Sequence, residues 1–255
     1  MVKSDVKAGR KANEMAIQDG DEAAKHAYQL LVVEMPKYGL HAANGTYEAV
    51  MGSCAKRGYR RLVLRTLNAL LERGPDSGEP LPSSRLFTIA IHSCGEGGSL
   101  SAALSLLDTM IDRGIEPNVV TYTALLGVCR QVADWRQALN LLQEMQDCGI
   151  EPNVVSYANV IHACGRAGEW QKAVQVLQSM SEESRTAPTS LDGYRSRVKP
   201  NVICYTAAVS ACGRAGQWHV VLELLNDMKA CGVQPNPCVA WGPQNPLEST
   251  VLALL

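Results

Sequence analysis

The chain has 255 residues, of which 46% are hydrophobic and 5% aromatic, and its formal net charge is −1. So few aromatic residues argue against a β-sandwich or barrel, and the near-neutral charge excludes a field that would attract nucleic acid over long distances. Any nucleic-acid contact must therefore come from a local surface. No run of about 18 apolar residues occurs, so we expect neither a membrane span nor a membrane partner.

The first elements of the chain are weak. Residues 1–43 end in GDEAAKHAYQLLVVEMPKYGL, which matches the ends of the later repeats, so we expect a degenerate repeat with its second helix over 21–40. The stretch before it contains Asp5, Glu14 and Asp19 and no apolar core, which fits neither a secretory signal nor an acid-poor transit peptide. A weak repeat is expected next, over residues 44–83, where Thr46 and Tyr47 stand for the Thr-Tyr pair of the later repeats.

Four stronger repeats follow, at 84–118, 119–153, 154–201 and 202–236. A proline lies two residues before the start of each of them. Successive prolines lie 35 residues apart (117 − 82, 152 − 117, 235 − 200), except for one spacing of 48 (200 − 152). The longer spacing places an inserted surface loop at about 181–199, which is rich in Ser, Thr and Arg. Three further prolines in the last 20 residues predict an irregular tail over 237–255.

Each strong repeat predicts two helices. Pro and Asn precede the first helix, and the turns CGRAGEW at 164–170 and CGRAGQW at 212–218 supply glycines for left-handed backbone where that helix ends. In the second helix, Ala138, Leu141, Leu142 and Met145 fall at i, i+3, i+4 and i+7, which is one helix face. One hairpin cannot bury such a face, so the pattern predicts stacked hairpins.

The 35-residue period, the opening PNVVTY at 117–122 and the A-x-x-L-L-x-x-M second helix resemble the pentatricopeptide repeat. The resemblance implies an all-α, right-handed α-solenoid of stacked helix-turn-helix repeats of about 35 residues. It further implies a protein without catalysis or cofactor that binds single-stranded RNA in a mitochondrion or chloroplast. One base is bound per repeat, and RNA-processing proteins are candidate partners in processing, stabilisation, editing, splicing or translation.

By the same resemblance, the fifth and the last residue of a repeat read one base, and the second residue wedges against it. The expected base-reading pairs are Thr88 with Asn118, Thr123 with Asn153, Ala158 with Asn201, and Thr206 with Asn236, and the expected wedges are Val120, Val155 and Ile203. Thr with Asn implies adenine, which gives 5′ A-A-N-A because Ala158 has no hydrogen-bonding group. The alternative for the asparagines is helix capping.

Arg85 and Ala158 depart from the pattern of the family. Arg85 replaces the wedge of its repeat, where it could stack on a base or contact phosphate. The pair in the weak repeat, Glu48 with Ser83, matches no assigned base.

Recurring cysteines and tryptophans indicate packing. Five cysteines share one repeat position, at which stacked helices lie about 8–10 Å apart, beyond the roughly 7 Å that a disulfide spans. We therefore interpret them as small packing residues and expect no metal site. Three tryptophans begin the second helices, where inter-repeat packing is favoured over base stacking. The cysteines are Cys54, Cys94, Cys129, Cys164 and Cys212, and the tryptophans are Trp135, Trp170 and Trp218.

Three functions compete. The first is base-selective binding of single-stranded RNA, and the second is a protein-binding scaffold, which would not need the column of Thr and Asn. The third is an enzyme, for which the chain shows no H-x-E…C-x-x-C deaminase signature, no carboxylate cluster for a metal and no phosphate loop. The first is favoured. The basic residues Arg166, Lys172, Arg214 and Lys229 line a phosphate path or solvate a face.

Overall fold

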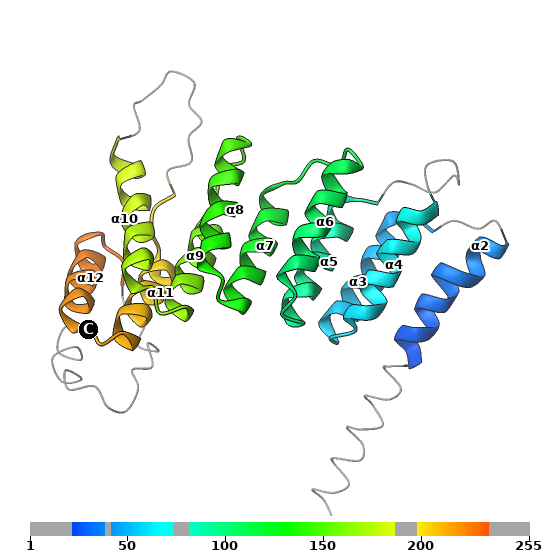
Figure 1. Ribbon diagram of the computed structural model, residues 1–255, viewed down its shortest axis with the longest axis horizontal. Coiled ribbons are helices and arrows are strands. Elements are labelled where there is room, and N and C mark those ends of the chain that lie inside the picture. Colours follow the sequence, from blue (N-terminus) through cyan, green and yellow to red (C-terminus); the bar gives the residue numbers. More distant parts are fainter. Residues whose placement is uncertain (1–21, 39–41, 74–81, 187–197, 235–255) are drawn as a thin grey trace, which may run out of the picture. The chain divides into compact units, whose positions relative to one another are not determined.

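The computed structural model describes residues 22–38, 42–73, 82–186 and 198–234, and all regular structure in these ranges is helical. The helices form two compact units, residues 1–97 with 102–116 and residues 98–101 with 117–255. Figure 1 shows the helices as successive antiparallel hairpins. None of the helices in the described ranges is long and apolar enough to cross a membrane. The predicted tail and residue Asn236 lie outside the described residues.

The first unit contains a single helical run followed by two hairpins. Residues 22–28 are helical and continue into the π-helical segment η1 (Gln29–Glu34) and into α2 (Met35–Lys37), close to the helix expected over 21–40. The hairpins are α3 (Asn44–Lys56) with α4 (Arg60–Arg73), and α5 (Ser84–Glu96) with α6 (Leu100–Asp112). α3 packs against both α4 and α5, and α4 also packs against α5. The two first helices therefore stack side by side.

The second unit contains three hairpins. They pair α7 (Val119–Val132) with α8 (Trp135–Asp147), α9 (Val154–Arg166) with α10 (Trp170–Thr186), and α11 (Val202–Arg214) with α12 (Trp218–Ala230). The first helices α7, α9 and α11 stack into one layer, and α8 and α10 each pack on the first helix of their own hairpin and of the next. The prediction of an all-α stack of helix-turn-helix repeats is thereby confirmed within each unit.

The apolar spacing of the second helices produces this stack. Ala138, Leu141 and Met145 are fully buried and Leu142 is nearly so, and the matching residues of α6, α10 and α12 are buried as well. The same face is shared between a hairpin and its neighbour, so burial is completed only by stacking. The first helices begin at residues 44, 84, 119, 154 and 202, where the repeats were predicted to start.

The turns after the first helices contain one anomaly. Gly168 and Gly216 have the positive φ values that the sequence predicted, 83° and 70°. In the turn after α7 the same place is taken by Ala133, whose φ is 59°, the one non-glycine residue with positive φ among those described. An alanine in this left-handed region is strained by its Cβ.

The helix α10 extends further than predicted. α10 continues through Thr186, so its helix extends six residues into the segment 181–199. Ser, Glu and Arg tolerate a helix, and the first proline comes only at Pro188. Residues 187–197 lie outside the described residues.

The recurring cysteines are buried free thiols, the environment that the packing interpretation predicts. Burial raises the pKa of the Cys129 thiol to about 12 and those of Cys164 and Cys212 to about 11. Because the thiolate is the form that binds metals and attacks electrophiles, these thiols are chemically quiet.

Candidate nucleic-acid interface

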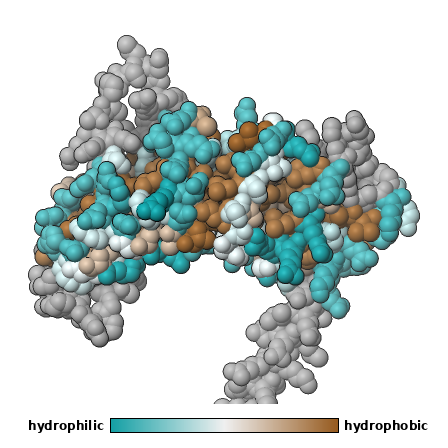
Figure 2. Space-filling model, in the orientation of Figure 1, coloured by the Kyte–Doolittle hydropathy of each residue, from teal (hydrophilic) through white to brown (hydrophobic). Residues whose placement is uncertain are grey.

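A row of exposed apolar side chains marks the layer of first helices in the second unit. Val120, Val155 and Ile203 are each the second residue of their helix, α7, α9 and α11, and they are 58%, 53% and 51% exposed. These are the three predicted wedge residues. Figure 2 shows hydrophobic residues exposed among hydrophilic ones on the face in view. Three large apolar side chains left in solvent at one repeat position are typical of a binding surface rather than of a core.

The predicted asparagines sit one residue before these helices and cap them. Asn118 Oδ1 accepts hydrogen bonds from the backbone N–H of Val120 at 2.9 Å and of Thr121 at 3.2 Å. Asn201 Oδ1 caps α11 in the same way, 3.0 Å from the nitrogen of Ile203. The capping alternative is therefore realised, while base reading by the same residues stays a prediction.

The structure brings the predicted pair Thr123 and Asn153 together through a third residue. Thr123 Oγ1 donates to the Val119 carbonyl at 2.6 Å and lies 3.0 Å from Ser156 Oγ. Ser156 Oγ donates to Asn153 Oδ1 at 3.2 Å, and Ser156 N donates to the same oxygen at 2.9 Å. Ser156 is completely buried. Sequence reasoning missed it, although a serine at the third position of a helix beside an Asn cap was a visible signal.

The next pair lacks this connection. Ala158 is almost completely buried and carries no polar group, and Cys204 stands where the previous repeat has Ser156. The Cys204 thiol instead points to the Val154 carbonyl at 3.8 Å. Poor discrimination between bases by Ala158 and Asn201 stays a prediction.

The remaining predicted residues are placed only in part. Thr206 is half-buried on α11, while its partner Asn236 lies outside the described residues. Thr88 is half-buried on α5, where its Oγ1 donates to the Ser84 carbonyl at 3.0 Å. Thr88 belongs to the first unit and Asn118 to the second.

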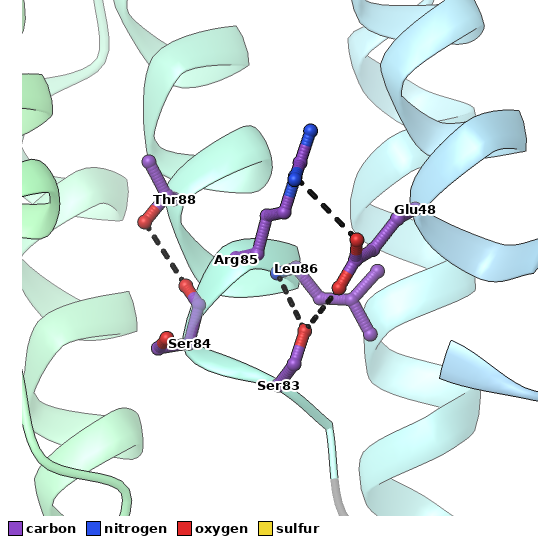
Figure 3. Close-up of polar contacts among 6 residues, drawn as sticks. All are labelled: Glu48, Ser83, Ser84, Arg85, Leu86 and Thr88. Atoms are coloured by element: carbon purple, nitrogen blue, oxygen red, sulfur yellow. Dashed lines mark hydrogen bonds and ion pairs between the residues drawn. The ribbon is translucent and has the colours of Figure 1, made fainter. Parts of the chain in front are cut away.

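Arg85 meets the pair Glu48 and Ser83 in the first unit (Figure 3). Ser83 Oγ donates to Glu48 Oε1 at 2.7 Å and also caps α5 by accepting from Leu86 N at 3.4 Å. Arg85 Nε lies 3.4 Å from Glu48 Oε2. The Arg85 side chain is 76% exposed and that of Glu48 is 22% exposed. Arg85 was expected to stack on a base or to contact phosphate, and its ion pair with Glu48 was not predicted.

The tryptophans lie elsewhere in the repeat. Trp135, Trp170 and Trp218 are the first residues of α8, α10 and α12, and each is half-buried. The guanidinium of Arg136 lies 5.0 Å from the centre of the Trp135 ring. Since these rings start second helices while the exposed apolar row lies on first helices, they are not part of that row.

Stacked helical hairpins with an apolar row repeated on the first helices define a helical-repeat protein. The model of the pentatricopeptide repeat domain matches residues 87–132, 105–166, 140–194 and 192–239. The chain therefore belongs to the pentatricopeptide repeat family. A comparison with curated proteins gives no match.

Solved structures show the same fold. The pentatricopeptide repeat protein PPR10 in complex with an 18-nt psaJ RNA element has 25% identity and a TM-score of 0.64, over 90% of this chain and 32% of that one. The structure of PPR10 from maize has 24% identity and a TM-score of 0.62, over 87% and 30% of the two chains. The PPR domain of Arabidopsis thaliana protein-only RNase P 1, in complex with tRNA, has 18% identity and a TM-score of 0.58, over 80% and 94%. The chain thus spans about a third of the length of PPR10.

Proposed function

We propose that this chain binds single-stranded RNA on the layer of α7, α9 and α11 and selects bases, with a preference for adenine-rich sequence. The observation that carries the proposal is the row of Val120, Val155 and Ile203, exposed in successive repeats. The similarity to PPR10, whose structure holds an RNA element, supports it. A scaffold for proteins would not need the polar pair Thr123 and Asn153 on this layer.

The side chains suit the edge of an unpaired base. Val120 and Val155 offer apolar surfaces to the faces of a base. Because the Thr123 hydroxyl donates to Val119 and Asn153 Oδ1 accepts from Ser156, Thr123 Oγ1 remains as an acceptor and the Asn153 amino group as a donor. Adenine presents an acceptor nitrogen beside an amino group and can pair with such groups. Since stacking contributes about 1–3 kcal/mol per base, a few repeats support micromolar or weaker binding.

We further propose that the protein acts by occupying its RNA, in a mitochondrion or chloroplast, and carries out no chemistry of its own. Bound RNA would be shielded from nucleases, remodelled, or presented to RNA-processing proteins for editing, splicing or translation. Family membership supports this role.

A binding titration tests the proposal. Fluorescence anisotropy with a labelled single strand containing AAUA should show tighter binding than the same strand in a duplex. Val155→Asp should weaken this binding at least tenfold, because a carboxylate would replace an apolar contact and repel phosphate. Ile111→Asp is the matched control, since Ile111 is 50% exposed but lies on the second helix α6. Equal losses in both variants, or tighter binding of the duplex, would exclude this surface.

A further inference from the structure

Three residues of the first unit lie at repeat positions discussed above, and they come from two successive repeats. Glu48 is the fifth residue of α3, as Thr123 is of α7. Ser83 is the N-cap of the following first helix, as Asn153 is, and Arg85 is its second residue, as Val155 is. The carboxylate of Glu48 thus replaces the hydroxyl of Thr123, and the hydroxyl of Ser83 replaces the amide of Asn153. The guanidinium of Arg85 replaces the apolar side chain of Val155.

We propose that Glu48, Ser83 and Arg85 form a guanine-selective subsite, which rests on the RNA binding proposed above. Its base would lie directly 5′ of the A-A-N-A stretch, because the repeat 44–83 precedes the repeat 84–118 in the chain.

The carboxylate of Glu48 is an acceptor with remaining capacity. Ser83 Oγ donates to Oε1 at 2.7 Å and Arg85 Nε forms an ion pair with Oε2 at 3.4 Å, so each oxygen has one partner and keeps a further lone pair. These two contacts lie on different oxygens of the carboxylate and so favour one orientation of it (Figure 3). Guanine presents two N–H donors side by side, N1–H and the 2-amino group, and so matches a carboxylate in a bidentate manner. Adenine, cytosine and uracil each present one donor group on that edge.

Arg85 makes a carboxylate compatible with RNA. The guanidinium cancels the charge that would repel phosphates, and its plane is a surface on which a base can stack. At 76% exposure, its ion pair adds little to the stability of the fold. The contact therefore does little to hold α3 and α5 together, and the exposed guanidinium is accessible to a base.

Four RNAs that differ only in X of 5′-XAAUA test the subsite by anisotropy. The strand with guanine should bind about tenfold more tightly than the other three, as one bidentate contact gives. Replacing guanine with inosine removes the 2-amino donor and should abolish most of this preference. Glu48→Gln should abolish it as well, because the amide turns one acceptor into a donor. Glu72→Gln, at an exposed glutamate of α4, should retain it.

The outcomes separate this subsite from the proposed function. If all four strands bind equally well, the subsite is wrong while RNA binding stands. If guanine is preferred but Glu48→Gln keeps the preference, another group reads the base and the assignment is overturned. If none of the strands binds, RNA binding and the subsite fail together. The inosine comparison uses the unaltered protein and so does not depend on how the variants fold.

Discussion

Replacing Ala133 with glycine should stabilise the protein. Ala133 ends α7 with φ 59° and ψ 30°, and left-handed backbone costs an L-residue about 1–2 kcal/mol. Glycine removes this cost but gains freedom in the unfolded chain, which takes back about 0.4–1 kcal/mol. The hydrogen bond from Asp134 N to the Cys129 carbonyl at 3.0 Å is a backbone bond and survives the change. The net gain in the free energy of unfolding is about 0.5–1 kcal/mol.

Urea unfolding followed by helical circular dichroism measures this gain. With a slope of about 2 kcal/mol per molar urea, the midpoint should rise by about 0.3–0.5 M. Gly168→Ala is the matched control, since Gly168 has φ +83 and no atom within 4 Å of an added Cβ. That variant should lower the midpoint through backbone strain alone. If Ala133→Gly leaves the midpoint unchanged or lowers it while Gly168→Ala lowers it, the strain assigned to Ala133 is refuted.

Three further predictions concern a buried thiol and the base-reading residues. Burial raises the pKa of Cys129 from its ordinary value of 9.0 to about 12, so the folded protein retains a proton that the unfolded chain loses. Its contribution to stability should be complete below pH 9 and lost towards pH 12, and a urea midpoint that holds steady above pH 9 would contradict this. Asn153→Asp keeps the cap acceptor for Ser156 N but replaces the amide donor, so preference at that repeat should move from adenine towards guanine, as titrations with single-base RNA variants would show. Ser156→Ala should flatten that same preference and cost about 1 kcal/mol of stability, whereas an undiminished preference for adenine would show that Thr123 needs no link to Asn153.

The repeat boundaries could be predicted from the sequence because local chemistry determines them. Asn118 and Asn153 follow a proline and cap the helix that starts at the next residue, so each helix start is encoded within a few residues. The buried face of α8 was predictable for a similar reason, since apolar residues spaced at i, i+3, i+4 and i+7 lie on one face of an α-helix. Each of these features needs no knowledge of a neighbouring repeat.

The missed features depend on contacts between repeats. The Glu48 carboxylate contacts Ser83, which is 35 residues away in the sequence. The spacing of the repeats predicts that these two residues are paired, but it does not predict that Arg85 also contacts Glu48. Ser156 links Thr123 to Asn153 only because α7 and α9 stack closely enough for two hydroxyl groups to lie 3.0 Å apart. Ala133 was missed for another reason, because alanine gives no local sign of left-handed backbone.

Capping and base reading, which the sequence presented as alternatives for the asparagines, are compatible in this structure. Asn153 Oδ1 accepts from Ser156 N at 2.9 Å and from Ser156 Oγ at 3.2 Å, and both bonds fix the side chain before any RNA arrives. Ordering a free side chain on binding costs about 0.5–1.5 kcal/mol of conformational entropy. Because the capping bonds already order the Asn153 side chain in the folded protein, binding does not incur this cost again. In the proposed function, the helix start therefore orients the amide that meets the base. Aspartate caps a helix about as well as asparagine does, so we expect that the base preference proposed for Asn153 can be changed without changing how α9 begins.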